Sequence, residues 1–139
     1  MRNAEFGIKG DDRVKENVVA DRSKAFALRI IRLYQYLCNE KHEYVLSKQV
    51  LRSGTSIGAN IREACRGQSK PDFYAKLNIS LKEADETAYW LELLHESDYI
   101  SDEQFESIYA DNEACLSRKD RKHIKYAKKY RLKHVIEDA

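Results

Sequence analysis

The sequence is poor in the residues that interrupt helices and build turns. Its 139 residues include one proline and five glycines. An all-β domain needs a turn roughly every 8–12 residues, and this chain lacks the residues that form such turns. With 35% charged and 42% hydrophobic residues, the composition is typical of a soluble helical domain rather than a disordered chain.

Long apolar runs and paired cysteines are also absent. No run of about 18 apolar residues is present, so the sequence predicts no membrane span. Residues 1–17 lack the apolar centre of a secretory signal. The three cysteines, Cys38, Cys65 and Cys115, are far apart and form no C-x-x-C pair. These absences predict a cytoplasmic protein with reduced thiols and no contact with a membrane.

Charge is distributed unevenly along the chain. Residues 1–117 hold 16 Lys and Arg against 20 Asp and Glu, a net charge of −4. Residues 118–134 hold nine Lys and Arg against one acid, Asp120, a net charge of +8. A basic C-terminal arm of this kind is typical of proteins that bind nucleic acid or another acidic surface.

Apolar residues recur at helical spacing in four segments. The expected helices cover residues 21–39, 45–66, 70–96 and 101–116. The third has the cleanest apolar seam, with steps of four and three residues: Phe73, Leu77, Ser80, Ala84, Thr87, Leu91 and Leu94. Such a heptad pattern indicates shallow packing between helices. The sequence therefore predicts an all-α, antiparallel up-down-up-down four-helix bundle.

Capping residues and composition set the expected boundaries. Gly67 stands where a C-capping glycine belongs, Ser69 is a good N-cap, and Ser101 with Gln104 fits a capping box. Residues 1–17 are predicted to be a flexible lead-in, residues 18–117 the bundle and residues 118–139 the basic arm. The pattern leaves open whether the arm extends the last helix or is disordered.

Small residues are concentrated in the second expected helix, in the segment SGTSIGAN at 53–60. Glycine inside a helix costs about 1 kcal/mol relative to alanine, so Gly54 and Gly58 indicate close approach of another helix. A phosphate-binding loop is the weaker alternative, because no G-x-x-x-x-G-K-[ST] pattern follows a strand. A polar stripe beside the seam, and a matching stripe on the third helix, are either solvated faces or an interface. The second interpretation is favoured because Trp90 is poorly placed in solvent. The candidate packing or subunit-interface residues are Ser53, Gly54, Ser56, Gly58, Asn60, Glu63, Glu83, Glu86 and Trp90.

Two ordered sequence blocks resemble a known family. LRSGTSIGANIREA at 51–64 matches the pattern R-S-x-x-S-I-x-x-N-I-x-E-A, and SKPDF at 69–73, LKEA at 81–84 and ETAYWL at 86–91 match a second block. The chain thus resembles the four-helix-bundle proteins encoded by intervening sequences in 23S ribosomal RNA genes. Accessory variability proteins of diversity-generating retroelements belong to the same superfamily. The resemblance implies a homo-oligomer, with a pentameric ring favoured. For the retroelement branch it also implies binding of nucleic acid and of a reverse transcriptase.

The chain departs from this family after about Glu113, where a basic segment replaces the usual apolar end of the last helix. The expected function is a non-enzymatic, self-associating scaffold that binds RNA or DNA through its arm, without cofactor or metal. The candidate phosphate-contacting residues are Lys119, Arg121, Lys122, Lys125, Lys128, Lys129, Arg131 and Lys133, and Tyr126 and Tyr130 are candidates for base stacking.

Three alternatives remain beside this expectation. The arm is a solvated tail, or the protein is an assembly module, for example a reverse-transcriptase accessory subunit, with no direct nucleic-acid role. A di-metal enzyme is the third, but it needs two E-x-x-H motifs, and the sequence has one, from Glu92 to His95.

Overall fold

The computed structural model describes the backbone of residues 10–138 and the side chains of residues 18–129. Five helices cover most of this range: α2 (Gly10–Asn39), α3 (Leu46–Cys65), α4 (Lys70–Glu96), α5 (Asp102–Ala114) and α6 (Arg118–Asp138). No strand occurs within residues 10–138. The predicted all-α class is confirmed.

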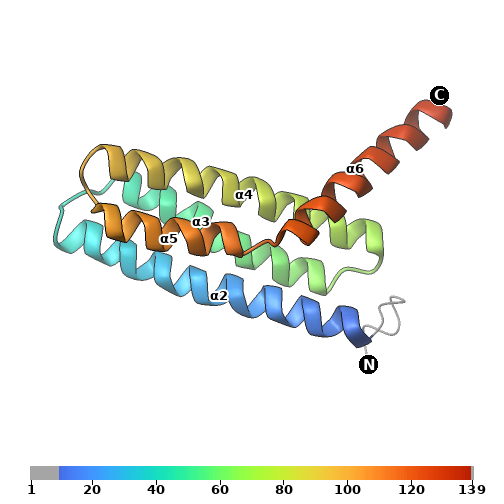
Figure 1. Ribbon diagram of the computed structural model, residues 1–139, viewed down its shortest axis with the longest axis horizontal. Coiled ribbons are helices and arrows are strands. Elements are labelled where there is room, and N and C mark those ends of the chain that lie inside the picture. The colour runs from blue at the N-terminus through green and yellow to red at the C-terminus, as the bar shows by residue number, and fades with distance from the viewer. Residues whose placement is uncertain (1–9, 139) are drawn as a thin grey trace.

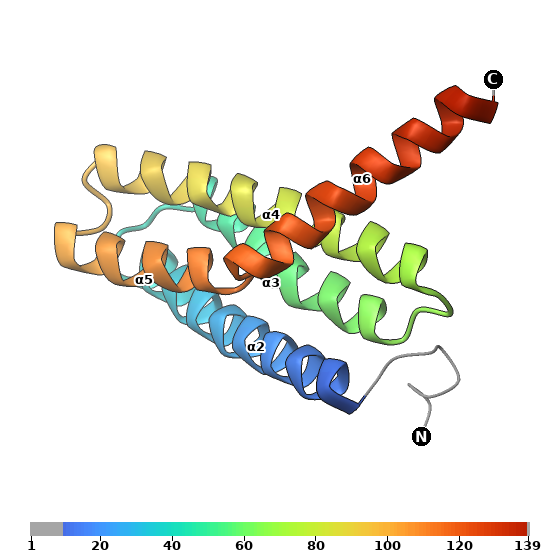
Figure 2. The same ribbon diagram turned by 45° about the vertical axis from the view of Figure 1, so that its right-hand side comes forward.

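Helices α2, α3, α4 and α5 lie side by side and form the body of the molecule (Figures 1 and 2). The contacts between α2 and α3 run in opposite directions along the two helices. Ser23, early in α2, lies beside Gly58, whereas Ile30, later in α2, lies beside Gly54, which precedes Gly58 in α3. The most extensive packing joins α3 to α4 and α2 to α3. Helix α6 leaves this body at an angle and projects beyond it in both views.

The core lies between these helices, where the apolar seams meet. On α3, the seam residues Val50, Ile57 and Ile61 are at most 1% exposed. The α4 seam is buried as well, from Leu77 to Leu94. Phe73, at its start, is only half-buried. The helical recurrence of apolar residues is therefore confirmed for α3, and the predicted seam of α4 is confirmed apart from Phe73.

Two of the three predicted caps are confirmed. The Ser69 hydroxyl accepts a hydrogen bond from the Asp72 amide at 3.3 Å, and Ser101 forms a reciprocal capping box with Gln104. Gly67 differs from the expectation, because its backbone is not in the left-handed region that a C-capping glycine adopts. It follows α3 with its amide bonded to the Ala64 carbonyl oxygen at 3.0 Å. An added Cβ would lie 3.1 Å from that same oxygen, so close approach explains the glycine.

The N-terminal boundary also differs from the prediction. Helix α2 begins at Gly10 rather than near Asp21, so residues 10–17 of the predicted lead-in belong to the first helix. Charged residues dominate this stretch, and the apolar periodicity that locates a helix from sequence is therefore weak there. The remainder of the predicted lead-in, residues 1–9, lies outside the described residues.

A short break separates the last two helices. Helix α5 ends at Ala114 and α6 starts at Arg118. The Ser117 hydroxyl accepts a hydrogen bond from the Asp120 amide at 3.1 Å, and the Asp120 carboxylate accepts one from the Ser117 amide at 2.9 Å. These reciprocal bonds start a new helix. The arm, left open by the sequence as helical or disordered, is helical through Asp138.

Candidate subunit and nucleic-acid interfaces

The small residues of α3 let α2 approach closely. A Cβ added at Gly54 would lie 2.8 Å from Ile30 Cγ1, and one added at Gly58 would lie 3.3 Å from the Ser23 carbonyl oxygen. The first distance is too short for a real side chain, so only glycine fits without a shift of Ile30. Close helix packing therefore accounts for the glycines of the small-residue segment.

Hydroxyl groups join α3 to α4 within the core. Thr87 Oγ1 lies 2.9 Å from Ser53 Oγ, and Ser80 Oγ donates to the Ile57 carbonyl oxygen at 3.0 Å. All three hydroxyl side chains are fully buried. Because buried polar groups are costly unless they are hydrogen-bonded, these pairs fix the register between α3 and α4. Ser53 thus contributes to helix packing within one chain rather than to a surface between subunits.

We call the side of α3 and α4 that carries Arg52, Glu63, Lys76, Glu83 and Glu86 the outer α3–α4 face. Its charged side chains form a network. Arg52 pairs with Glu86, and its Nη1 lies 3.5 Å from Glu83 Oε2. Further along the face, Lys76 Nζ lies 2.8 Å from Glu63 Oε2. Burial raises the pKa of Glu83 above its ordinary value, Arg52 opposes this rise, and the hydrogen bond with Glu86 adds to it. The polar stripes of the two helices are therefore matched to each other.

Ser56 and Asn60, on the same face of α3, are engaged within their own helix. Ser56 Oγ donates to the Arg52 carbonyl oxygen at 2.6 Å, and Asn60 Nδ2 donates to the Ser56 carbonyl oxygen at 2.8 Å. Neither side chain joins α3 to α4 through a hydrogen bond in residues 18–129. Both are half-buried and keep short polar groups along the outer face.

The outer α3–α4 face also carries apolar side chains that are not buried in the core. Ile79 is 39% and Tyr89 54% exposed. Trp90 packs partly against the core and edge-on against Tyr89 at 5.3 Å between ring centroids. The buried indole nitrogen of Trp90 has no hydrogen-bond partner among residues 18–129. A face with exposed aliphatic and aromatic groups beside matched charges has the composition of a protein–protein contact.

Helix α6 is anchored to the body by its first turns. Ile124 is 3% exposed, and His123 packs edge-on against Tyr74 of α4 at 6.2 Å between ring centroids. Arg121 Nε donates to the Leu116 carbonyl oxygen at 3.1 Å, and its Nη2 lies 3.8 Å from Glu113 Oε2. Of the candidate phosphate-contacting residues, Arg121 is thus bound to the body.

The remaining described cations of α6 face solvent. Four of them recur at steps of four, three and four residues along one side of the helix: Arg118, Lys122, Lys125 and Lys129. We call this set the basic stripe. Its members are exposed, as are the neighbouring candidates Lys119, Tyr126 and Lys128. The side chains of Tyr130, Arg131 and Lys133 lie outside the described residues.

Two arginines of α2, seven residues apart, contact α5 and the region where α5 gives way to α6. Arg29 Nη1 bonds to Asp111 Oδ2 of α5 at 2.6 Å. One heptad earlier, Arg22 Nη2 lies 3.5 Å from the Cys115 carbonyl oxygen and 4.0 Å from Asp120 Oδ2. Neither arginine was predicted as a contact residue from the sequence. Their signal is a pair of cations seven residues apart, at the edge of the apolar face of α2.

The cysteines, histidines and carboxylates considered for catalysis or metal binding have separate surroundings in the part of the chain whose side chains are described. Burial raises the pKa of the Cys115 thiol to about 12, which suppresses the reactive thiolate. Glu92 is exposed, while His95 lies 2.6 Å from Asp102. Residues 18–129 hold no cluster of three or more His, Cys, Asp and Glu side chains suited to a metal ion. None of the described helices is long and apolar enough to cross a membrane.

Comparison with known proteins adds a family match and a solved structure. A family model described as "23S rRNA-intervening sequence protein" matches residues 15–118. A crystal structure of a protein of unknown function from the S23 ribosomal protein family of Bacteroides thetaiotaomicron is 58% identical, with a TM-score of 0.76. The match covers 80% of this chain and 98% of that one. No curated protein matches the chain. The family match ends at Arg118, where α6 begins.

Proposed function

This chain belongs to the 23S rRNA-intervening sequence protein family, and we propose that it is a non-enzymatic scaffold, built on an antiparallel four-helix bundle, that binds nucleic acid through α6. The observation that carries the proposal is the basic stripe: cations on a helix that projects from the body. Asp120 is the one acid between residues 118 and 129, and it caps α6 and lies near Arg22. No other acid in residues 118–129 is therefore present to neutralise the charge of the basic stripe.

The stripe has the form that phosphate binding needs. At a rise of about 1.5 Å per residue, the cations from Arg118 to Lys129 extend over roughly 16 Å of helix. Each phosphate that a cation neutralises releases condensed counterions, so affinity depends steeply on salt. Tyr126, 71% exposed, supplies an aromatic face on which an unpaired base stacks. This combination favours sequence-tolerant binding of single-stranded or structured RNA over base-specific readout.

Self-association is the second part of the proposal. The outer α3–α4 face, with Ile79, Tyr89 and Trp90 beside its charge network, is the surface proposed to contact a second copy. A ring of five copies would present several α6 helices to one nucleic acid, and linked weak sites bind with higher avidity than one. The cytoplasm is the proposed location, since RNA is available there.

Fluorescence anisotropy of a labelled structured RNA tests the role of the stripe. Deleting α6 would remove the buried Ile124, so three exposed lysines are replaced in the full chain instead: Lys122→Gln, Lys125→Gln and Lys129→Gln. The slope of log affinity against log salt is expected to become shallower by about 2, because each single-strand phosphate contact contributes about 0.7.

The matched control replaces three exposed lysines of the body: Lys24→Gln, Lys48→Gln and Lys82→Gln. It changes the net charge equally, so equal losses in both variants would reduce the effect to overall charge and contradict the stripe as the binding surface. Light scattering of the unaltered chain tests the oligomer. A monomer at micromolar concentration would contradict the proposed ring.

A second candidate function is an assembly module for another protein, such as a reverse transcriptase, with no nucleic-acid role. The exposed Ile79 and Tyr89 favour it, because apolar contacts of this kind form protein interfaces. It predicts a stable oligomer in light scattering whose mass is unchanged by added RNA, and full-length chain that leaves RNA anisotropy unchanged even at low salt.

A further inference from the structure

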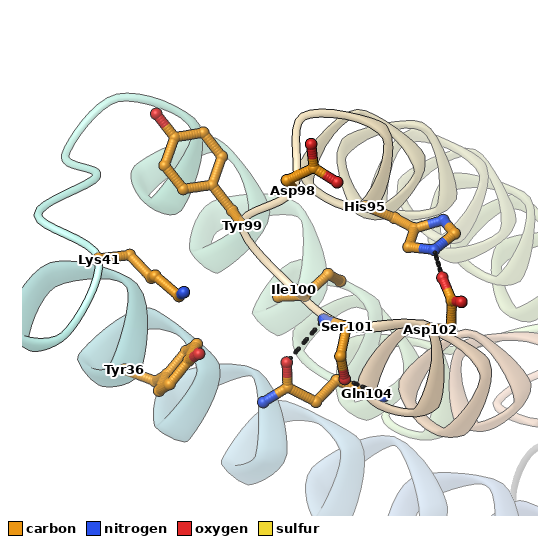
Figure 3. A pocket seen from close by; sticks show the side chains of 9 residues that line it. All are labelled: Tyr36, Lys41, His95, Asp98, Tyr99, Ile100, Ser101, Asp102 and Gln104. Carbon is orange, nitrogen blue, oxygen red and sulfur yellow. Dashed lines mark hydrogen bonds and ion pairs between the residues drawn. The ribbon is translucent and has the colours of Figure 1, made fainter.

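A cavity of about 420 Å³ is lined by residues of two connections, which lie at the end of the body away from the projecting α6 (Figure 1). It opens between two connections: residues 40–45, which join α2 to α3, and residues 97–101, which join α4 to α5 (Figure 3). Its volume is within the range of small-molecule sites. It is separate from both the basic stripe and the outer α3–α4 face.

One side of the cavity combines hydrogen-bond donors with two aromatic rings. Figure 3 shows Lys41 and Tyr36 on one wall, Tyr99 above them and Gln104 below. The Lys41 ammonium group has no ion-pair partner among residues 18–129. Gln104 Oε1 accepts a hydrogen bond from the Ser101 amide at 2.8 Å, which leaves the Gln104 amino group as a donor toward the cavity. An ammonium group and an amide donor together suit an anionic oxygen.

The other side supplies an acceptor. Asp98 lies between Tyr99 and His95 (Figure 3), and its carboxylate forms no ion pair within the described side chains. Its neighbour His95 is already engaged by Asp102 and stacks on Phe105 at 4.3 Å between ring centroids. Asp98 has a positive φ of 66°, a conformation that aspartate and asparagine adopt more often than most other residues. The Asp98 side chain is exposed, so its carboxylate is accessible to a ligand in the cavity.

We propose that this cavity binds one unpaired guanosine nucleotide of an RNA strand. The phosphate lies on Lys41 and the Gln104 amino group, the base stacks on Tyr99 or Tyr36, and Asp98 accepts hydrogen bonds from the base edge. Guanine presents two adjacent N–H donors on its Watson–Crick edge, which a carboxylate can accept together, whereas uracil presents one. The inference rests on the proposed RNA-binding function and names a second site for it.

Nuclear magnetic resonance titration of the ¹⁵N-labelled full chain tests this site directly. Guanosine 5′-monophosphate is expected to shift the backbone amides of Tyr99 and Ser101 saturably, and uridine 5′-monophosphate to bind more weakly. Asp98→Asn keeps the shape and the positive φ, since asparagine tolerates that region. It is expected to reduce the preference for guanosine about fivefold or more, because a bidentate base contact discriminates by at least that factor. An unchanged preference would overturn the assignment of Asp98.

Matched variants separate the remaining contacts. Lys41→Gln is expected to weaken both nucleotides several-fold, and Lys48→Gln, an exposed lysine that does not line the cavity, to leave both unchanged. Tyr99→Leu should lose stacking, whereas Tyr44→Leu, in the same end of the body, should not. Equal effects of Lys41→Gln and Lys48→Gln, or no saturable shift with either nucleotide, would overturn the site.

Two tetranucleotides distinguish an RNA strand from a free nucleotide as the ligand. UUGU is expected to shift the same amides at lower concentration than guanosine 5′-monophosphate, and UUUU to shift them less. If the mononucleotide binds as tightly as UUGU, the RNA part of the inference is wrong. Loss of the cavity shifts with intact salt-dependent RNA binding by α6 would overturn this inference alone. Loss of RNA binding with intact mononucleotide shifts would overturn the proposed function of α6.

Discussion

Helices α3 and α6 have nearly the same length, 20 and 21 residues, but they are held in place in different ways. Seven α3 residues are buried, among them Ser47, Ser53 and Gly54, and helices pack against it on two sides. In α6, Ile124 is the one buried side chain between residues 118 and 129. A helix in the body is thus specified by what its small and apolar residues contact. The projecting helix contacts the body through its first turns, by Ile124, His123 and Arg121, and the cations of its basic stripe stay exposed.

The largest effect should come from filling the close contact in the body. Gly54→Leu places a side chain where even a Cβ would lie 2.8 Å from Ile30. We expect a loss of about 3 kcal/mol in the free energy of unfolding, because overpacking a well-filled core forces backbone shifts. Denaturant unfolding measures the loss.

Ala59→Leu is the control, since Ala59 is exposed on the same helix and should change stability by no more than about 0.5 kcal/mol. Equal stability of the Gly54→Leu variant and the unaltered chain would contradict the account of close approach, and with it the contrast between α3 and α6.

A smaller and local effect is expected at the anchor of α6. Ile124→Ala removes a buried side chain, which costs about 2 kcal/mol or more where the site cannot collapse. Because α6 contacts the body through few residues, the loss should appear as faster amide hydrogen exchange in α6, with little change in the melting temperature of the body. Lys125→Ala, exposed on the same helix, should leave exchange unaffected. A melting temperature that falls as far as in a core variant would mean that α6 and the body unfold together.

The smallest effect concerns the start of α3, where Glu43 acts as a cap. Its carboxylate accepts backbone hydrogen bonds from Leu46 at 2.9 Å and Ser47 at 2.7 Å. Burial by itself would raise the pKa of Glu43, but the backbone bonds outweigh it and hold the pKa below its ordinary value. Glu43→Gln should therefore lower stability at neutral pH by about 1 kcal/mol, as loss of a cap does.

The pH dependence gives this prediction its sign. A lowered pKa in the folded chain means that ionised Glu43 stabilises the fold above the ordinary value of 4.5, and that this contribution is lost as pH falls through the lowered pKa. The difference between the unaltered chain and Glu43→Gln should shrink over that interval in unfolding measurements. Glu40→Gln, an exposed acid in the same connection, is the control. A difference that persists undiminished at lower pH would contradict a role for the charge.

Much of the body was predictable because its signals are local. The seams of α3 and α4 follow from residue spacing, and the Ser69 and Ser101 caps follow from residue type, since both act within one or two helical turns. The start of α2 was predicted too late because its first turns carry charges instead of an apolar stripe. The cap at Glu43 was not predicted, since a carboxylate that caps the next helix from outside leaves no fixed spacing in the sequence.

The candidate sites also combine features that were predictable from the sequence with features that were not. The basic stripe is visible in the sequence as a run of cations, and the family resemblance follows from two ordered blocks. The engagement of Arg121 with Glu113 and Leu116 is not visible there, because it depends on the angle at which α6 leaves α5. The cavity between residues 40–45 and 97–101 had no sequence signal, since its walls come from segments more than fifty residues apart.

The helical class, the apolar seams, the basic composition of the C-terminal segment and the family resemblance were all predictable from the order of residues alone. Each of these properties depends on residues that are neighbours along the chain or one helical turn apart. The tertiary structure decided which cations remain exposed, which polar stripes pair with each other, and which loops enclose a cavity. Those properties depend on distances between groups remote in sequence, and packing of the folded chain alone sets these distances.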